Sequence, residues 1–117
     1  MGKEICVDDE KYIDMATAVS GSGPAYIFLL MESLVDAAVH IGLPRQIAQE
    51  LVLQTVLGSG HFVRKSGKLP AELRRMVTSP GGTTTEALLE LEKGEFANLV
   101  AKAVSAAYNK AKRLGDK

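Results

Sequence analysis

The residues best suited to chemistry lie in one stretch, Thr78-Ser79-Pro80-Gly81-Gly82-Thr83-Thr84-Thr85-Glu86. Pro80 fixes one backbone dihedral and the two glycines after it permit conformations closed to other residues, so the first half predicts a turn. Thr83 and Glu86 have capping-box spacing, so the second half predicts a helix start. Backbone N–H groups and hydroxyls at such a start suit a carboxylate or a phosphate. The alternative is a well-capped junction that binds no ligand.

Other polar residues are weaker candidates. Glu10 and Asp14 are four residues apart and could place two carboxylates on one helical face, although ordinary surface helices share this spacing. His40 and His61 have no partner at metal-ligand spacing, so we expect both at the surface or the core edge and expect no metal site. Cys6 is the only cysteine, which excludes an internal disulfide and a thiolate cluster.

The residues themselves show no cofactor motif. Gly21 and Gly23 lack the third glycine of the dinucleotide fingerprint, and no predicted strand precedes them. Nothing resembles a phosphate-binding loop that ends in Gly-Lys-Ser/Thr. By residue pattern alone, the chain has polar, glycine-lined turns but no cofactor-binding unit of its own.

Composition limits the class of protein. A chain of 117 residues suits one domain with a modest core. The 14 Lys+Arg balance the 14 Asp+Glu, so charge gives no reason to expect nucleic acid or an anionic membrane as a partner. No unbroken run of about 18 apolar residues occurs, so no membrane span is expected. Met1-Gly2-Lys3-Glu4 precedes no signal-peptide core, and a cytoplasmic protein is expected.

The N-terminal part is predicted to hold one unusually apolar helix. Ser20–Tyr26 predicts a tight turn, in which Ser22 caps the following helix and Pro24 occupies its first turn. The helix expected over 23–41 is apolar in nearly every direction around its axis. A helix of that kind is buried on all sides, so we expect a second subunit to cover it.

The remaining elements complete an all-α domain of five or six helices over residues 8–117. Residues 1–7 are expected to be an extended lead-in, with Asp8 or Asp9 capping a short helix that runs through Ala16. Gly42 should end the long helix and Pro44 should open the next one in its first turn. Helical spacing of apolar residues predicts helices over 45–65 and 95–114, and Ser66-Gly67 should stop the first of them. Pro70 should open a short helix over 71–77, and the capped start should lead into a helix over 83–93.

Three stretches carry a resemblance to a known family. They are Ser20-Gly21-Ser22-Gly23-Pro24-Ala25-Tyr26, Gly42-Leu43-Pro44-Arg45 and Val77-Thr78-Ser79-Pro80-Gly81-Gly82-Thr83-Thr84. Their order and spacing resemble the C-terminal half of pyrroline-5-carboxylate reductase. The residues Gln54-Thr55-Val56 and Leu73-Arg74 also resemble that family, and the likeness extends from Val7 to Leu114.

The resemblance implies an all-helical dimerisation domain whose helices interlock between two subunits. In the family it follows an N-terminal Rossmann domain that binds NADPH or NADH, and some members assemble dimers into larger rings. The enzyme reduces the C=N bond of 1-pyrroline-5-carboxylate to give L-proline, the last step of proline biosynthesis. Because no Rossmann half precedes Met1, we expect a fragment that supplies dimerisation and substrate-carboxylate binding and is inactive alone.

The resemblance also assigns site residues. The turn expected to bind the substrate carboxylate comprises Ser79, Pro80, Gly81, Gly82 and Thr83, and Thr84 is expected to act as the catalytic residue beside the ring nitrogen. Further substrate contacts are expected from Glu10, Ser22, Gly23 and Pro24. Met76 is expected near the cofactor, although Arg75 and Met76 depart from residues usual in the family. If Gly82 has a positive φ, Gly82→Val should disturb the turn and weaken proline binding.

Two other functions stay open at this point. One is a non-catalytic helical oligomerisation module, and the other is the same domain of another imine or hydroxyacid reductase. A glycine-rich strand–turn–helix fingerprint upstream of residue 1 would favour an enzyme over a module. Substrate profiling of a full-length protein would separate the two kinds of reductase.

Overall fold

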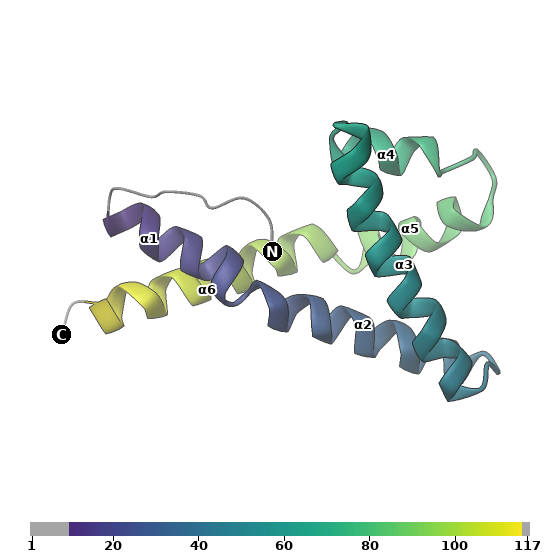
Figure 1. Cartoon of the computed structure of the whole chain (residues 1–117), viewed down its shortest axis with the longest axis horizontal. Coiled ribbons are helices and arrows are strands. Elements are labelled where there is room, and N and C mark those ends of the chain that lie inside the picture. Colours follow the sequence, from purple (N-terminus) through teal and green to yellow (C-terminus); the bar gives the residue numbers. More distant parts are fainter. Residues whose placement is uncertain (1–9, 116–117) are drawn as a thin grey trace. The chain divides into compact units, whose positions relative to one another are not determined.

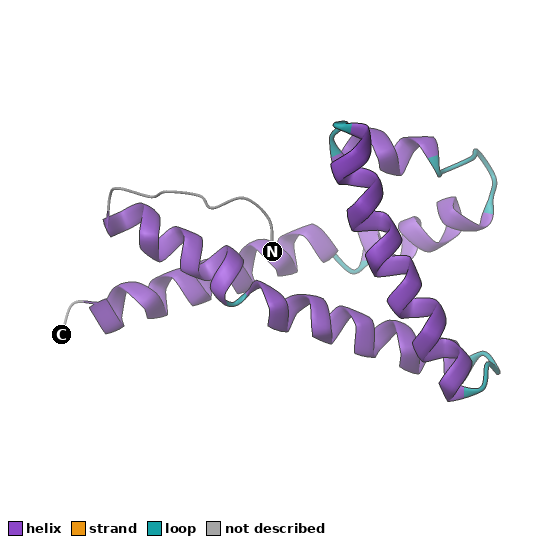
Figure 2. Cartoon of the chain, in the orientation of Figure 1, coloured by secondary structure: helices purple, strands orange, loops and turns teal. Residues whose placement is uncertain are grey.

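The computed structural model describes residues 10–115, which fold as helices and connecting loops (Figure 2). The α-helices are α1 (Glu10–Ala16), α2 (Gly23–His40), α3 (Arg45–Ser66), α4 (Pro70–Met76), α5 (Thr83–Lys93) and α6 (Phe96–Gly115), and a π-helical segment, η1 (Thr17–Gly21), lies between α1 and α2. The predicted all-α class is confirmed. The predicted lead-in over 1–7, the cap at Asp8 or Asp9 and Cys6 lie outside the described residues.

One compact unit combines residues 10–27 with residues 95–115. In this unit α6 packs against α1 and η1, as the purple and yellow helices of Figure 1 show. On α6 the partly covered side chains are Val104, Ala107, Tyr108 and Ala111, which recur at helical spacing. Ala18 of η1 is 1% exposed, and its small side chain lets neighbouring backbone approach closely.

The tight turn predicted over Ser20–Tyr26 is wrong. The chain is helical from Glu10 to His40, and Ser22 has an αR backbone with φ −84 and ψ −19. Ser22 therefore lacks the extended conformation of the N-cap that the sequence predicted. The hydroxyls of Thr17 and Ser20 donate to carbonyls four residues back, at 2.9 Å in both cases, so these polar residues are accommodated within a helix.

The second compact unit is Phe28–Gly94, and its helix ends follow the predicted residues closely. Gly42 has φ +118 and Gly67 has φ +67, conformations that favour glycine, and each ends a helix as predicted. Pro70 is the first residue of α4, where its missing N–H would have no helical acceptor. Pro44 lies one step earlier than predicted, because it is the N-cap of α3.

This unit leaves most of its apolar side chains open. Its buried residues are Ala48, Val52 and Leu73, and α2 contains no buried residue. Phe28 and Leu29 on α2 are 66% and 63% exposed. Among the described residues, the helix pairs with extensive packing all belong to the first unit. The predicted all-round apolar helix is therefore present, and among the described residues most of its large apolar side chains are exposed.

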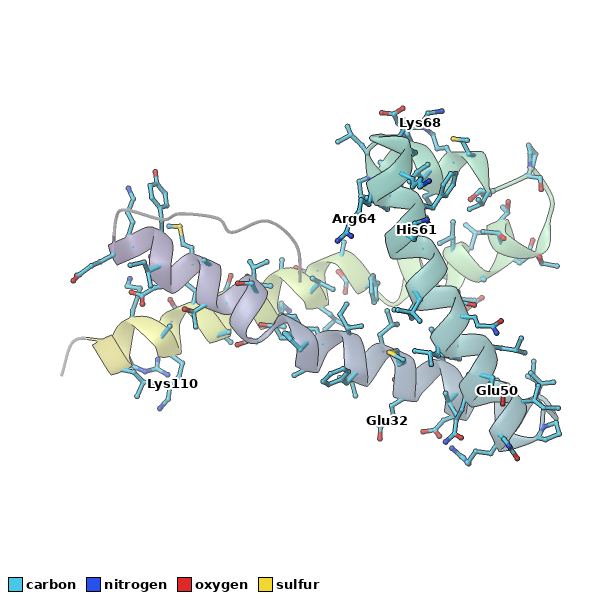
Figure 3. All side chains as sticks on the ribbon, viewed as in Figure 1. Glu32, Glu50, His61, Arg64, Lys68 and Lys110 are labelled. Atoms are coloured by element: carbon cyan, nitrogen blue, oxygen red, sulfur yellow. The ribbon has the colours of Figure 1, made fainter. Side chains whose placement is uncertain are left out.

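The helical run Glu10–His40 is also long and apolar enough to cross a membrane by length and composition, with a mean hydropathy of 1.3 over its qualifying window. The prediction of no span considered only unbroken apolar runs, so it missed this window. Glu32 and Asp36 interrupt the run, and Figure 3 shows Glu32 projecting from α2. An acidic residue at a bilayer centre costs about 2.5–3.5 kcal/mol on translocon insertion scales. The core helix of a soluble protein and a signal sequence near an N-terminus pass the same test, so this finding is weak evidence for a span.

The left-handed residues at two helix boundaries should respond to substitution in opposite directions. Gly67→Ala should lower the free energy of unfolding by about 1 kcal/mol, because Ala is strained at φ +67 although open space surrounds the added Cβ. Glu95 has φ +57, so Glu95→Gly should be neutral or stabilising by about 0.5 kcal/mol. Urea unfolding at one fixed protein concentration measures both, and a loss of the same size in both variants would contradict this account.

Candidate functional site

The loop between α4 and α5 contains a hydrogen-bonded turn at Ser79–Gly82. The Gly82 N–H donates to the Ser79 carbonyl at 3.0 Å. Pro80 occupies the second position of this turn, and Gly81 occupies the third with φ +72. Proline followed by a residue of positive φ is the pattern of a type II turn. The turn predicted from these residues is therefore present.

Thr85 fixes this turn to the start of α5. Its hydroxyl donates to the Ser79 carbonyl at 2.6 Å, so that one oxygen accepts both this bond and the bond from the Gly82 N–H. No role for Thr85 was predicted from the sequence, where the expected site residues end at Thr84. The sequence did contain a sign of this bond, because Thr85 is a hydroxyl residue three positions after Gly82. A side chain in the first turn of α5 can reach back to the preceding loop.

The predicted capping box at Thr83 and Glu86 is wrong. Gly82 is the N-cap of α5, with an extended backbone of φ −87 and ψ 178, and no side chain caps this helix end. The helix starts one residue earlier than a box at Thr83 requires, because Glu86 N–H already donates to the Gly82 carbonyl at 3.3 Å. The N–H groups of the first turn, Thr83–Thr85, therefore have no capping side chain. A helix end of this kind favours a negatively charged ligand.

The two glycines of the turn are required for different reasons. Gly81 has the positive φ, whereas Gly82 does not, so the premise of the predicted Gly82→Val effect is wrong. Gly82 is instead limited by space. A Cβ added there would lie 3.2 Å from the Ser79 carbonyl oxygen and 3.2 Å from Ser79 Oγ. Any side chain at position 82 would press on the residue that accepts both turn bonds.

The preceding helix holds the loop from its other side. Leu73 of α4 is 7% exposed, and its carbonyl accepts the Val77 N–H at 3.2 Å. The Thr78 hydroxyl donates to the Arg74 carbonyl, which keeps the chain in a helical path until the turn begins. Met76 is 57% exposed at the end of α4, and Lys68 Nζ lies 3.7 Å from its sulfur. Its contact with a cofactor stays a prediction.

The other predicted site residues belong to the first unit. Glu10 is the exposed first residue of α1. Ser22 and Gly23 are half-buried where η1 meets α2, and Pro24 beside them is exposed. The structure thus brings the residues from Ser79 to Thr85 together in one loop, and it describes Glu10 and Ser22–Pro24 separately, within another compact unit.

A shallow hollow lies along α3. The residues that line it are not among those predicted to form the site. Its lining is Val56, Leu57, Gly60, His61 and Arg64. Figure 3 shows His61 and Arg64 on this one helix. All of these lining residues lie on one helix, and we assign the hollow no chemistry. No group of three or more His, Cys, Asp or Glu side chains in residues 10–115 could hold a metal ion.

Comparison with known proteins identifies relatives along almost the whole chain. The Arabidopsis thaliana pyrroline-5-carboxylate reductase is 52% identical over 106 residues, which cover 91% of this chain and 38% of the relative. The Synechocystis enzyme is 48% identical over 108 residues, covering 92% of this chain and 40% of the relative. The chain thus spans about two fifths of the length of these relatives.

Solved structures show the same fold. A Plasmodium falciparum pyrroline carboxylate reductase with NADP bound superposes with a TM-score of 0.89 at 47% identity, over 92% of this chain and 41% of that chain. A Coxiella burnetii pyrroline-5-carboxylate reductase gives the same TM-score and identity, over 92% of this chain and 40% of that one. The family model for pyrroline-5-carboxylate reductase dimerisation matches residues 10–114. The chain therefore belongs to the pyrroline-5-carboxylate reductase dimerisation family.

Proposed function

We propose that this chain serves as the dimerisation and substrate-carboxylate-binding domain of an enzyme that reduces 1-pyrroline-5-carboxylate to L-proline with NADPH or NADH. The observation that carries this proposal is the Ser79–Thr85 loop. Its turn is held by two hydrogen bonds to one carbonyl, and it leads directly into an uncapped helix start. Such a start offers backbone N–H donors to a carboxylate without first having to be ordered.

Different groups of the loop contact different parts of the substrate. The N–H groups of Thr83 and Thr84 and the Ser79 hydroxyl donate to the substrate carboxylate, and each such bond to a charged acceptor contributes about 1.5–3 kcal/mol. The Thr84 hydroxyl orients the ring nitrogen, which gains a proton when the C=N bond is reduced. These contacts lower the barrier by positioning and by preorganised electrostatics. Glu10, Ser22, Gly23 and Pro24 supply further substrate contacts.

The cofactor is bound by a part of the enzyme outside these residues. Residues 10–115 contain no β-strand, and Gly21 and Gly23 lie within a helical run. The described residues therefore do not fit the strand–turn–helix site that binds a dinucleotide pyrophosphate. Met76, exposed beside the loop, is the residue of this chain that we place against the nicotinamide.

A second copy of the chain covers the apolar helices. The name of the matching family model, which includes dimerisation, and the open side chains of α2 support this assignment. Covering one Leu or Phe contributes about 1.5–3 kcal/mol, so a few such contacts match the whole stability of an ordinary domain. Acidic residues along Glu10–His40 favour a protein partner over lipid. We place the dimer, or a ring of such dimers, in the cytoplasm.

The proposed activity is tested by assaying the full-length protein that contains this domain. Pyrroline-5-carboxylate is supplied with NADPH or NADH, and both nucleotide oxidation and proline formation are measured. Proline formation supports the proposal. Reduction only of other cyclic imines or of oxoacids would identify another reductase with the same plan. Absence of any reduction would leave the oligomerisation module as the function of the chain.

Thr84 should matter more for turnover than for folding. Thr84→Ala in the full-length enzyme should lower kcat about tenfold or more, because the ring nitrogen loses the group that orients it. Its half-exposed position should keep the loss of stability below about 1 kcal/mol. Thr84→Ser retains the hydroxyl and serves as the control, which should recover most of the turnover. Unchanged steady-state kinetics of Thr84→Ala would refute the assigned role.

Thr85 should affect binding through the turn. Thr85→Val removes the bond to the Ser79 carbonyl while keeping the shape of the side chain, so proline affinity should fall about fivefold, equivalent to about 1 kcal/mol. Thr55→Val is the matched control, because its hydroxyl donates to the Leu51 carbonyl within α3 at 2.7 Å. Calorimetric titration of full-length protein with proline measures both. Equal affinities of the Thr85 and Thr55 variants would count against the turn as a binding element.

A further inference from the structure

The π-helical segment η1 leads directly into Ser22-Gly23-Pro24, which the proposed function places at the substrate. Ser22 N–H donates to the Thr17 carbonyl, five residues back, at 2.9 Å. In an α-helix the same N–H would donate to the Ala18 carbonyl, four residues back. In the π register the Ala18 carbonyl therefore lacks its usual backbone donor. Ala18 is only 1% exposed.

A tyrosine hydroxyl supplies the donor that Ala18 has lost. Tyr26 Oη donates to the Ala18 carbonyl at 2.8 Å, across eight residues of sequence. A buried carbonyl left without a donor costs about 1–3 kcal/mol, so this bond removes a penalty that would otherwise oppose the π register. The bond starts one turn into α2 and ends inside η1, which fixes the segment that contains Ser22 between its two ends.

Pro24 gives a reason for the register change at this place. It has no N–H to continue the helical ladder, and in an α-helix its ring would clash with the carbonyl four residues back, which belongs to Ser20. The extra residue of a π turn absorbs such a conflict. Pro24 therefore disfavours the α register, and Tyr26 stabilises the π register that replaces it.

We propose that Tyr26 is a positioning residue for substrate binding, whose hydroxyl holds the π register and so sets the direction of Ser22 and Gly23. Return to an α register would rotate these residues by about 100° around the helix axis, which is the rotation of one residue. This inference rests on the proposed function for its link to substrate, whereas the control of register by Tyr26 does not depend on it.

The other tyrosines of the chain provide matched controls. The rings of Tyr12 and Tyr108 lie against the ammonium groups of Lys11 and Lys112, at 5.1 and 5.2 Å. A Tyr→Phe change at either place leaves such a ring contact available and removes only the hydroxyl. Tyr108 is the closer control, because it is half-buried and also belongs to the first compact unit.

The first measurement is hydrogen exchange at the Ser22 amide in the full 117-residue chain. Tyr26→Phe should accelerate this exchange at least tenfold, and Tyr108→Phe should leave it unchanged. Pro24→Ala, which restores the missing N–H, is an independent second variant and should perturb the same amide. Unchanged Ser22 exchange in both the Tyr26 and Pro24 variants would overturn control of the register by these residues.

The second measurement is the kinetics of the full-length enzyme. Tyr26→Phe should raise KM for pyrroline-5-carboxylate about fivefold or more with less than a twofold change in kcat, a split that general loss of folded protein would not produce. An altered Ser22 amide with an unchanged KM would overturn the positioning role. If the wild-type enzyme fails to reduce this substrate, the proposed function fails, and the exchange data still decide whether Tyr26 controls the register.

Discussion

The central physical constraint on this fold is apolar helix surface that lies exposed among residues 10–115. The buried residues among those described are Ala18, Ala48, Val52 and Leu73, none of them aromatic. Phe28 and Leu29 remain mostly exposed, as does most of the apolar surface of α2. Net folding stability is only about 5–15 kcal/mol, and ordering each residue costs about 1–2 kcal/mol of backbone entropy. A core this small does not offset that entropy. We therefore propose that a second copy of the chain completes the fold.

This dependence links assembly to the proposed chemistry. The Ser79–Thr85 loop is fixed locally by the two bonds to the Ser79 carbonyl, and α4 is anchored below it through Leu73. These local bonds keep the turn in one conformation. The helices next to the loop, however, belong to the unit Phe28–Gly94, which has more exposed large apolar side chains than the other unit. Weakening the proposed dimer should therefore loosen the helices around the Ser79–Thr85 loop before it alters the turn itself.

Much of this fold follows from the sequence, because many helix boundaries are set by local chemistry. Gly42 and Gly67 end helices through backbone conformations that other residues rarely adopt, and Pro70 opens one. The η1 segment could not be predicted in this way. Glycines and serines before Pro24 are typical of a turn, whereas the chain stays helical there and the Tyr26 hydroxyl bonds to the Ala18 carbonyl.

In the candidate site, too, features set by neighbouring residues could be predicted from the sequence, and features set by bonds across the loop could not. Residue pattern alone located the turn at Ser79–Gly82, and resemblance to a family supplied the role that we propose for it. The capping box at Thr83 was wrong because Gly82 takes the cap position, and Thr85 was missed because its bond crosses the loop. Which glycine has the positive φ also depends on the whole turn, since proline at its second position places that conformation at Gly81.

Sedimentation equilibrium of the isolated 117-residue chain, in buffer without detergent, tests the central claim most directly. We expect a dimer at concentrations on the order of 1–100 µM, with a thermal midpoint that rises with protein concentration because folding and association are coupled. A folded, helical monomer over that range, with a midpoint independent of concentration, would contradict the account.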